Sequence, residues 1–82
     1  MTSDEKTLLR MRNNPRDWRI EELQTVAAKF GVEVRNPRGS HVVFSHPLVM
    51  DMVCIPAHKP VKPIYVRKLL EMLQRIEEAN HD

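Results

Sequence analysis

The stretch VEVRNPRGSHVVFSHPLVMDMVCI, residues 32–55, contains three short segments rich in β-branched or apolar residues and separated by turn residues. The segments are VEVR at 32–35, HVVFSH at 41–46 and MDMVCI at 50–55. Proline, glycine and asparagine between them are typical of tight turns. Because parallel strands need much longer connections, the pattern predicts three antiparallel strands.

Amphipathic helices are predicted on both sides of these strands. WRIEELQTVAAKFG, residues 18–31, ends in a glycine that suits a left-handed stop. The proline-punctuated loop PAHKPVKP at 56–63 leads into a final helix, and Pro63 suits the first turn of this helix. Apolar residues recur at helical spacing at Ile20, Leu23, Ala27 and Phe30, and at Val66, Leu69, Leu70, Leu73 and Ile76. Two helices covering one face of the sheet give an α+β domain whose other face is open.

Residues 1–16 precede this unit and are predicted to form an N-terminal helical extension to a domain at residues 17–82. The apolar side chains of the extension are Leu8, Leu9 and Met11. We expect the extension to cover the sheet edge left by the first or second strand, because uncovered edges invite unwanted pairing.

The net charge of +2 is unevenly distributed along the chain. Residues 1–34 carry six basic and six acidic side chains, whereas residues 35–68 carry six basic side chains against Asp51 alone. Residues 69–82 are acidic. A basic excess in the middle of the chain suits an anionic partner such as a nucleic-acid backbone, although a solvated basic face explains it equally well.

Several classes of protein are disfavoured by composition. A single cysteine, Cys54, cannot form an intramolecular disulfide, which fits a reducing compartment. The four histidines and this cysteine lack metal-binding spacing, so we expect neither a metal nor another cofactor. No apolar run is long enough to span a membrane, and the N-terminus lacks the order of a signal peptide. A soluble, cytoplasmic protein without a membrane partner is the expectation.

Side-chain alternation separates the two histidines of the central strand. One face receives His41, Val43 and Ser45, and the other receives Val42, Phe44 and His46. Phe44 is the strongest core candidate, so its face meets the helices. His41 then projects to the open side, whereas His46 lies at the strand's end on the core side, where it can reach solvent or hydrogen-bond the turn.

The chemistry around His41 is compatible with catalysis. Histidine is the usual general acid or base near neutral pH, because its unperturbed pKa is about 6.5. Gly39 lets a substrate backbone approach, and the cations that could hold a phosphate are Arg38, Lys59 and Lys62. From spacing alone, however, a solvated histidine at a strand end is the more common situation.

Gly39-Ser40-His41, followed by a strand containing Phe44, resembles the glycine, serine or threonine, histidine motif of the HicA toxins, the messenger-RNA interferases of bacterial toxin–antitoxin pairs. KFGVEVR at 29–35 and VCIPAHKPVKPIYVRKLLEML at 53–73 are similar to the family's flanking segments. The resemblance covers roughly residues 19 to 76. It implies a fold like a double-stranded-RNA-binding domain, RNA cleavage that depends on the motif histidine, and neutralisation by a HicB antitoxin.

The resemblance implies an endoribonuclease in which His41 is catalytic. The hypothesis for its mechanism is metal-free cleavage of single-stranded or locally unpaired RNA by 2′-hydroxyl attack on the adjacent phosphodiester, with His41 as the base or as the acid for the leaving 5′-oxygen. Gly39 and Ser40 match the motif's turn. The residues expected to bind RNA are Arg38, Gly39, Ser40, His58, Lys59 and Lys62. His58 is the better candidate for a second proton-transfer group and His46 the weaker one. A non-catalytic RNA-binding module and a protein-interaction domain are the alternatives.

The turn SHPLVMDM, residues 45–52, is unusually hydrophobic. Methionines at strand spacing are usually core residues. Met50 and Met52 are otherwise expected to pack against the extension or against an antitoxin.

Overall fold

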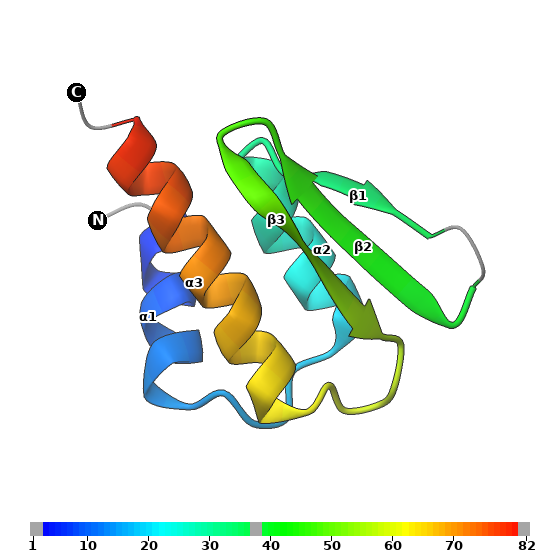
Figure 1. Ribbon diagram of the computed structural model, residues 1–82. Helices are drawn as coiled ribbons and strands as arrows, with labels where there is room; N and C mark the ends of the chain where they lie inside the picture. The colour runs from blue at the N-terminus through cyan, green and yellow to red at the C-terminus, as the bar shows by residue number, and fades with distance from the viewer. Residues whose placement is uncertain (1–2, 37–38, 81–82) are drawn as a thin grey trace.

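The computed structural model describes residues 3–36 and 39–80. Its elements are α1 (Ser3–Asn13), α2 (Ile20–Lys29), β1 (Glu33–Arg35), β2 (His41–His46), β3 (Val49–Pro56) and α3 (Pro63–Ala79). Figure 1 shows the helices together on one side of the sheet, whose other face is uncovered. The predicted α+β class and the order of helix, three strands and helix are confirmed. None of the described helices has the length and hydrophobicity needed to cross a membrane.

The strands form one antiparallel sheet in the order β1-β2-β3. Val34 lies opposite Phe44 in the first pair, and Val42 lies opposite Ile55 in the second. Residues directly opposite one another share a face, so these apolar side chains form the layer that meets the helices. His41 is exposed while its neighbour Val42 is buried, which confirms the alternation predicted along β2.

The ends of α2 and α3 follow from local chemistry. Helix α3 begins at Pro63, where the missing N–H costs no helical hydrogen bond. The carboxylate of Glu22 accepts a 3.0 Å hydrogen bond from the backbone N–H of Arg19 at the start of α2. Beyond the end of α2, Gly31 has φ of 77°, a conformation that glycine adopts without steric cost. The predicted left-handed stop is therefore confirmed.

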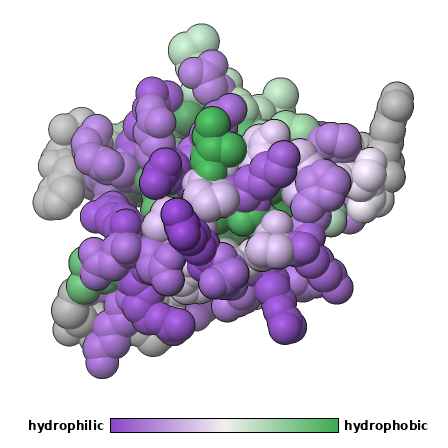
Figure 2. All heavy atoms as spheres, turned by 90° about the horizontal axis from the view of Figure 1, so that it is seen from below, coloured by the Kyte–Doolittle hydropathy of each residue, from purple (hydrophilic) through white to green (hydrophobic). Residues whose placement is uncertain are grey.

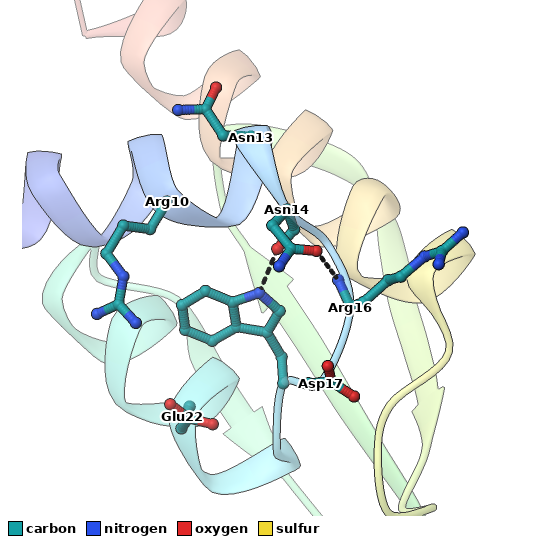
Figure 3. A pocket seen from close by; sticks show the side chains of 7 residues that line it. Arg10, Asn13, Asn14, Arg16, Asp17 and Glu22 are labelled. Atoms are coloured by element: carbon teal, nitrogen blue, oxygen red, sulfur yellow. Dashed lines mark hydrogen bonds between the residues drawn. The ribbon is translucent and has the colours of Figure 1, made fainter.

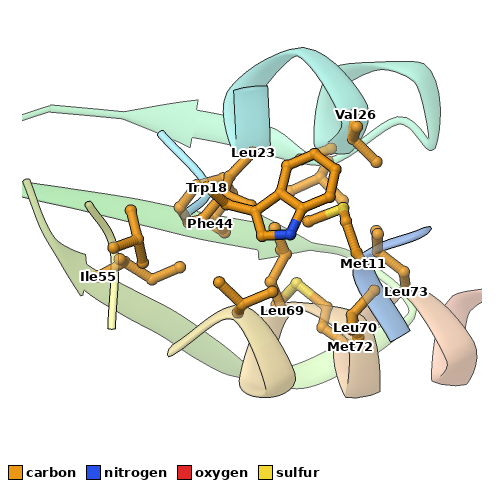
Figure 4. Close-up of a cluster of buried hydrophobic side chains, with 14 of the residues drawn as sticks. Met11, Trp18, Leu23, Val26, Phe44, Ile55, Leu69, Leu70, Met72 and Leu73 are labelled. Atoms are coloured by element: carbon orange, nitrogen blue, oxygen red, sulfur yellow. The ribbon is translucent and has the colours of Figure 1, made fainter. Parts of the chain in front are cut away.

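The core lies between the helices and the sheet (Figure 4). Helix α3 buries every apolar position that its spacing predicts, and Met72 in addition. Side chains with almost no exposed surface come from every part of the chain: Met11, Leu23, Val42, Phe44, Ile55, Val61, Val66, Leu69, Leu73 and Ile76. Each large aliphatic or aromatic side chain buried in this way contributes roughly 1.5–3 kcal/mol to stability.

Helix α1 does not cover the sheet edge, so that expectation was wrong. It packs against α2 and α3, on the side of the helices away from the sheet (Figure 1). Leu8 and Met11 are buried in the common core, whereas Leu9 points outward and is 47% exposed. Without α1, apolar surface on α2 and α3 would be exposed to water. Burying this surface is more favourable than covering a short edge strand.

The methionines of the β2–β3 turn are not core residues and do not pack against the extension. Met50 is 99% exposed and Met52 is 68% exposed. The strand pairing shifts between Phe44 and His46, so one residue of β2 faces three residues of β3. A bulge of this kind bends its strand and re-aims side chains, which accounts for the outward position of both methionines.

Candidate functional site

His41 is the first residue of β2 and lies on the uncovered face of the sheet. Its Nδ1 is 3.2 Å from the hydroxyl oxygen of Ser40, and both side chains are exposed. If Nδ1–H donates to this oxygen, the lone pair of Nε2 is left available to accept a proton. The geometry therefore allows His41 to act as a base toward a ligand on the open face.

Gly39 provides open space beside this histidine. Its φ of 71° is a conformation that residues with a side chain rarely adopt, and a Cβ built on it would meet no atom within 4 Å. The glycine is therefore required by the backbone of the turn rather than by crowding within the protein. A ligand backbone can approach His41 from this side.

The loop after β3 starts next to the histidine. His41 lies opposite Pro56, and the carbonyl oxygen of Ser40 accepts a 2.9 Å hydrogen bond from the N–H of Ala57. His58 follows in an exposed position, with its own N–H donating to the carbonyl oxygen of Pro56 at 2.9 Å. The structure thus brings the backbone of His58 to the end of the sheet where His41 is located.

The far end of the same loop is attached to the segment that precedes α2. The N–H of Val61 donates a 2.8 Å hydrogen bond to the carbonyl oxygen of Trp18, and both side chains are buried. Lys59 and Lys62 are exposed, and Lys62 is the residue before the first turn of α3. The loop therefore presents Lys59 to solvent between its two attachment points, and Lys62 directly after the second one.

His46 is separated from this region. It lies at the opposite end of β2, on the face toward the helices, and is only partly exposed. Its Nδ1 accepts a 3.0 Å hydrogen bond from the N–H of Leu48, which confirms the predicted contact with the turn. A Cβ on Gly31 would lie 3.6 Å from its Nε2, so both ring nitrogens face the protein.

Two arginines that the sequence analysis did not select, Arg16 and Arg19, lie in the segment that the Trp18–Val61 hydrogen bond joins to residues 57–62, called the basic loop. Arg19 and Lys59 line the same surface depression, together with Asp17 and Pro60. The sequence shows a tryptophan flanked by arginines, but it does not show which loop this tryptophan meets. Only the Trp18–Val61 hydrogen bond reveals the association.

Ion pairing distinguishes these cations from others on the surface. Arg35 pairs with Glu33 at 2.9 Å, and Arg75 pairs with Glu71 at 2.7 Å. The exposed cations of the loop and of the segment joined to it have no carboxylate within ion-pair distance among residues 3–36 and 39–80. They are Arg16, Arg19, Lys59 and Lys62. Figure 2 views the molecule from the end that carries the loop, and hydrophilic side chains cover most of this face.

Two residues considered in the sequence, Arg38 and His81, lie outside the described residues. In the described part of the chain, no group of three His, Cys, Asp or Glu side chains is arranged to hold a metal ion. The free thiol of Cys54 is exposed on the same face as Val43, its cross-strand partner.

The comparison with known families agrees with the resemblance seen in the sequence. A family model described as HicA toxin of bacterial toxin-antitoxin matches residues 20–74 of the 82-residue chain. Neither the curated proteins nor the solved structures compared with the chain gave a match. The matched segment contains α2, the three strands and most of α3, which are the elements that position His41. The chain therefore belongs to the HicA family of toxins of bacterial toxin–antitoxin systems.

Proposed function

We propose that this toxin is an endoribonuclease that cuts messenger RNA and that His41 is its catalytic residue. The observation that carries the proposal is the position of His41, exposed on the uncovered sheet face beside the open space at Gly39. A base must reach its proton through space that a substrate can occupy, and the exposed side chain of His41 borders such space.

The proposed reaction is attack by a ribose 2′-oxygen on the adjacent phosphorus. A bond forms between O2′ and phosphorus, and the bond between phosphorus and O5′ breaks. His41 takes the proton from the 2′-hydroxyl, and a second group gives a proton to the leaving 5′-oxygen. The products are a 2′,3′-cyclic phosphate and a free 5′-hydroxyl, and the step needs no oxidant or cofactor.

His58 is the better candidate for the second group. Its backbone lies just beyond Pro56, which is the cross-strand partner of His41. His46 lies at the far end of β2 with its ring nitrogens toward the protein, so we assign it no proton transfer. Lys59 and Lys62, together with Arg38, would hold phosphates and offset the negative charge that develops in the transition state.

The protein partner proposed for this toxin is a HicB-like antitoxin, because the chain belongs to a toxin–antitoxin family. A non-catalytic RNA-binding module is the second candidate function. The unpaired cations beside the loop favour it, since they would bind RNA whether or not His41 transfers a proton.

The decisive experiment incubates the purified chain with RNA beside its His41→Ala and His46→Ala variants. Wild type and His46→Ala are expected to cut RNA and to slow bacterial growth, whereas His41→Ala is expected to do neither. RNA carrying a 2′-deoxy residue at the cut site should resist cleavage. Binding without cleavage by wild type would favour the non-catalytic module, and equal cleavage of the deoxy substrate would exclude 2′-hydroxyl attack.

A further inference from the structure

The segment between α1 and α2, residues 14–19, is called the linker here, and hydrogen bonds fix its shape. The indole N–H of Trp18 donates to the carbonyl oxygen of Asn14 at 2.6 Å. The N–H of Arg16 donates to the side-chain oxygen of Asn14 at 3.2 Å. Both interactions are drawn as dashed lines at Asn14 in Figure 3, and Trp18 is only 7% exposed. Arg16 and Arg19 therefore extend from a backbone with a defined conformation.

The linker is also fixed relative to the basic loop at residues 57–62. The Trp18–Val61 hydrogen bond joins the two segments at one end of the loop. The Ser40–Ala57 hydrogen bond joins the loop to the His41 turn at its other end. The loop thus connects the His41 turn with the linker. Exposed Lys59 lies between the two hydrogen bonds, and exposed Lys62 directly follows Val61.

The linker arginines are available for a ligand. Arg16 and Arg19 are exposed and, within the described residues, have no ion-pair partner. Arg10 differs, because its guanidinium lies over the Trp18 ring at 5.5 Å from the centroid. Two carboxylates oppose these charges. Asp17 borders the depressions lined by Arg16 and by Arg19, and Glu22 borders the one lined by Arg16 and accepts a hydrogen bond from the Arg19 N–H.

We propose that Arg16 and Arg19 form a second phosphate-binding site for the RNA, continuing the path that starts at His41 and crosses the basic loop. The inference rests on the proposed function in one respect, that RNA is the substrate. A guanidinium is suited to this task because its planar set of donors matches two phosphate oxygens. Both arginines precede residues 20–74, so the site lies outside the segment that matches the family model.

The measurable signature is the salt dependence of RNA binding. Each phosphate contact on a single strand contributes about 0.7 to the slope of log affinity against log salt concentration. The double variant R16Q/R19Q should therefore bind RNA with a slope about 1.4 shallower than wild type. Its affinity should fall by about tenfold, because an exposed charge contact is worth up to roughly fivefold.

The matched control is K6Q/R12Q, which removes the same charge from α1. Arg12 lies in a different depression, beside Glu77 of α3, and Lys6 is exposed on α1. Fluorescence anisotropy with a short labelled 2′-O-methyl RNA, which cannot be cut by 2′-hydroxyl attack, reports binding for the full chain. The control should show a slope within about 0.3 of wild type, since its residues would contact no phosphate.

The outcomes separate this site from the proposed nuclease. If wild type cuts natural RNA but the salt-dependence slope of R16Q/R19Q equals that of the control K6Q/R12Q, the linker site is wrong and the nuclease stands. If wild type does not cut RNA but R16Q/R19Q alone lowers the slope, the linker site stands and the nuclease fails. If the labelled RNA does not bind wild type, the linker site is overturned.

Discussion

The carbonyl oxygen of Trp18 accepts a hydrogen bond of 2.8 Å from the backbone N–H of Val61, and the side chains of both residues are buried. Through this bond, the segment before α2 and the loop before α3 form one continuous edge of the molecule. Charges from both segments are therefore available to one RNA strand, as the proposed linker site requires. One acidic residue, Asp17, lies between the linker arginines in the sequence.

Asp17→Asn should increase RNA affinity several-fold, because it removes the negative charge beside Arg16 and Arg19. Asp17 has φ of 63°, and asparagine adopts this conformation about as readily as aspartate. The free energy of unfolding, measured by thermal denaturation, should therefore change by no more than about 0.5 kcal/mol. Anisotropy with the labelled RNA tests the affinity, and an unchanged value would place the RNA path away from the linker.

His41→Ala and His46→Ala should separate activity from stability. His41 is exposed, so its loss should abolish RNA cleavage and change the free energy of unfolding by at most about 0.5 kcal/mol. His46→Ala removes the acceptor for the Leu48 N–H and should cost about 1 kcal/mol while cleavage continues. Urea unfolding and an RNA cleavage assay on both variants check this. Unfolding of His41→Ala would make that histidine structural.

Gly39 should be replaceable only by residues that tolerate positive φ. The Cβ of a valine at this position would meet no neighbour, but the residue has to adopt φ of 71°, at a cost of roughly 1–2 kcal/mol or more. Relaxation of that strain would rotate the backbone that carries His41, so cleavage should fall as well. Gly39→Asn is the matched variant, because asparagine adopts positive φ more readily than valine. It should retain more stability and more RNA cleavage than Gly39→Val. Equal behaviour of the two variants would contradict a role for backbone conformation.

Helix α1 should be necessary for stability, since it contributes to the shared core. Met11→Ala removes a side chain with 0% exposure and should destabilise the protein by about 2–5 kcal/mol. Leu9→Ala, two residues earlier and 47% exposed, is the control and should change stability by about 0.5 kcal/mol or less. Chemical denaturation of both variants gives the comparison. A similar small effect for both would show that α1 is dispensable to the fold.

Short-range patterns were sufficient to predict most of the fold and the orientation of the candidate catalyst. Alternation along β2 correctly placed Phe44 inward and His41 outward, because successive side chains on a strand must point to opposite faces. Helical spacing correctly predicted the buried face of α3, and the glycine after α2 correctly predicted its end. The exposure of Met50 and Met52 was missed, since a bulge depends on how two strands register.

The sequence by itself determined the α+β class and the family, together with the strand that presents His41, because these follow from periodicity and from motifs of neighbouring residues. The tertiary structure alone decided that α1 packs on the helices, and that Trp18 meets Val61 so that the linker arginines lie beside the basic loop. Such contacts join residues far apart in the chain. They depend on which apolar surfaces remain to be buried after the helices and strands have formed. No local sequence pattern specifies which of these surfaces pack together.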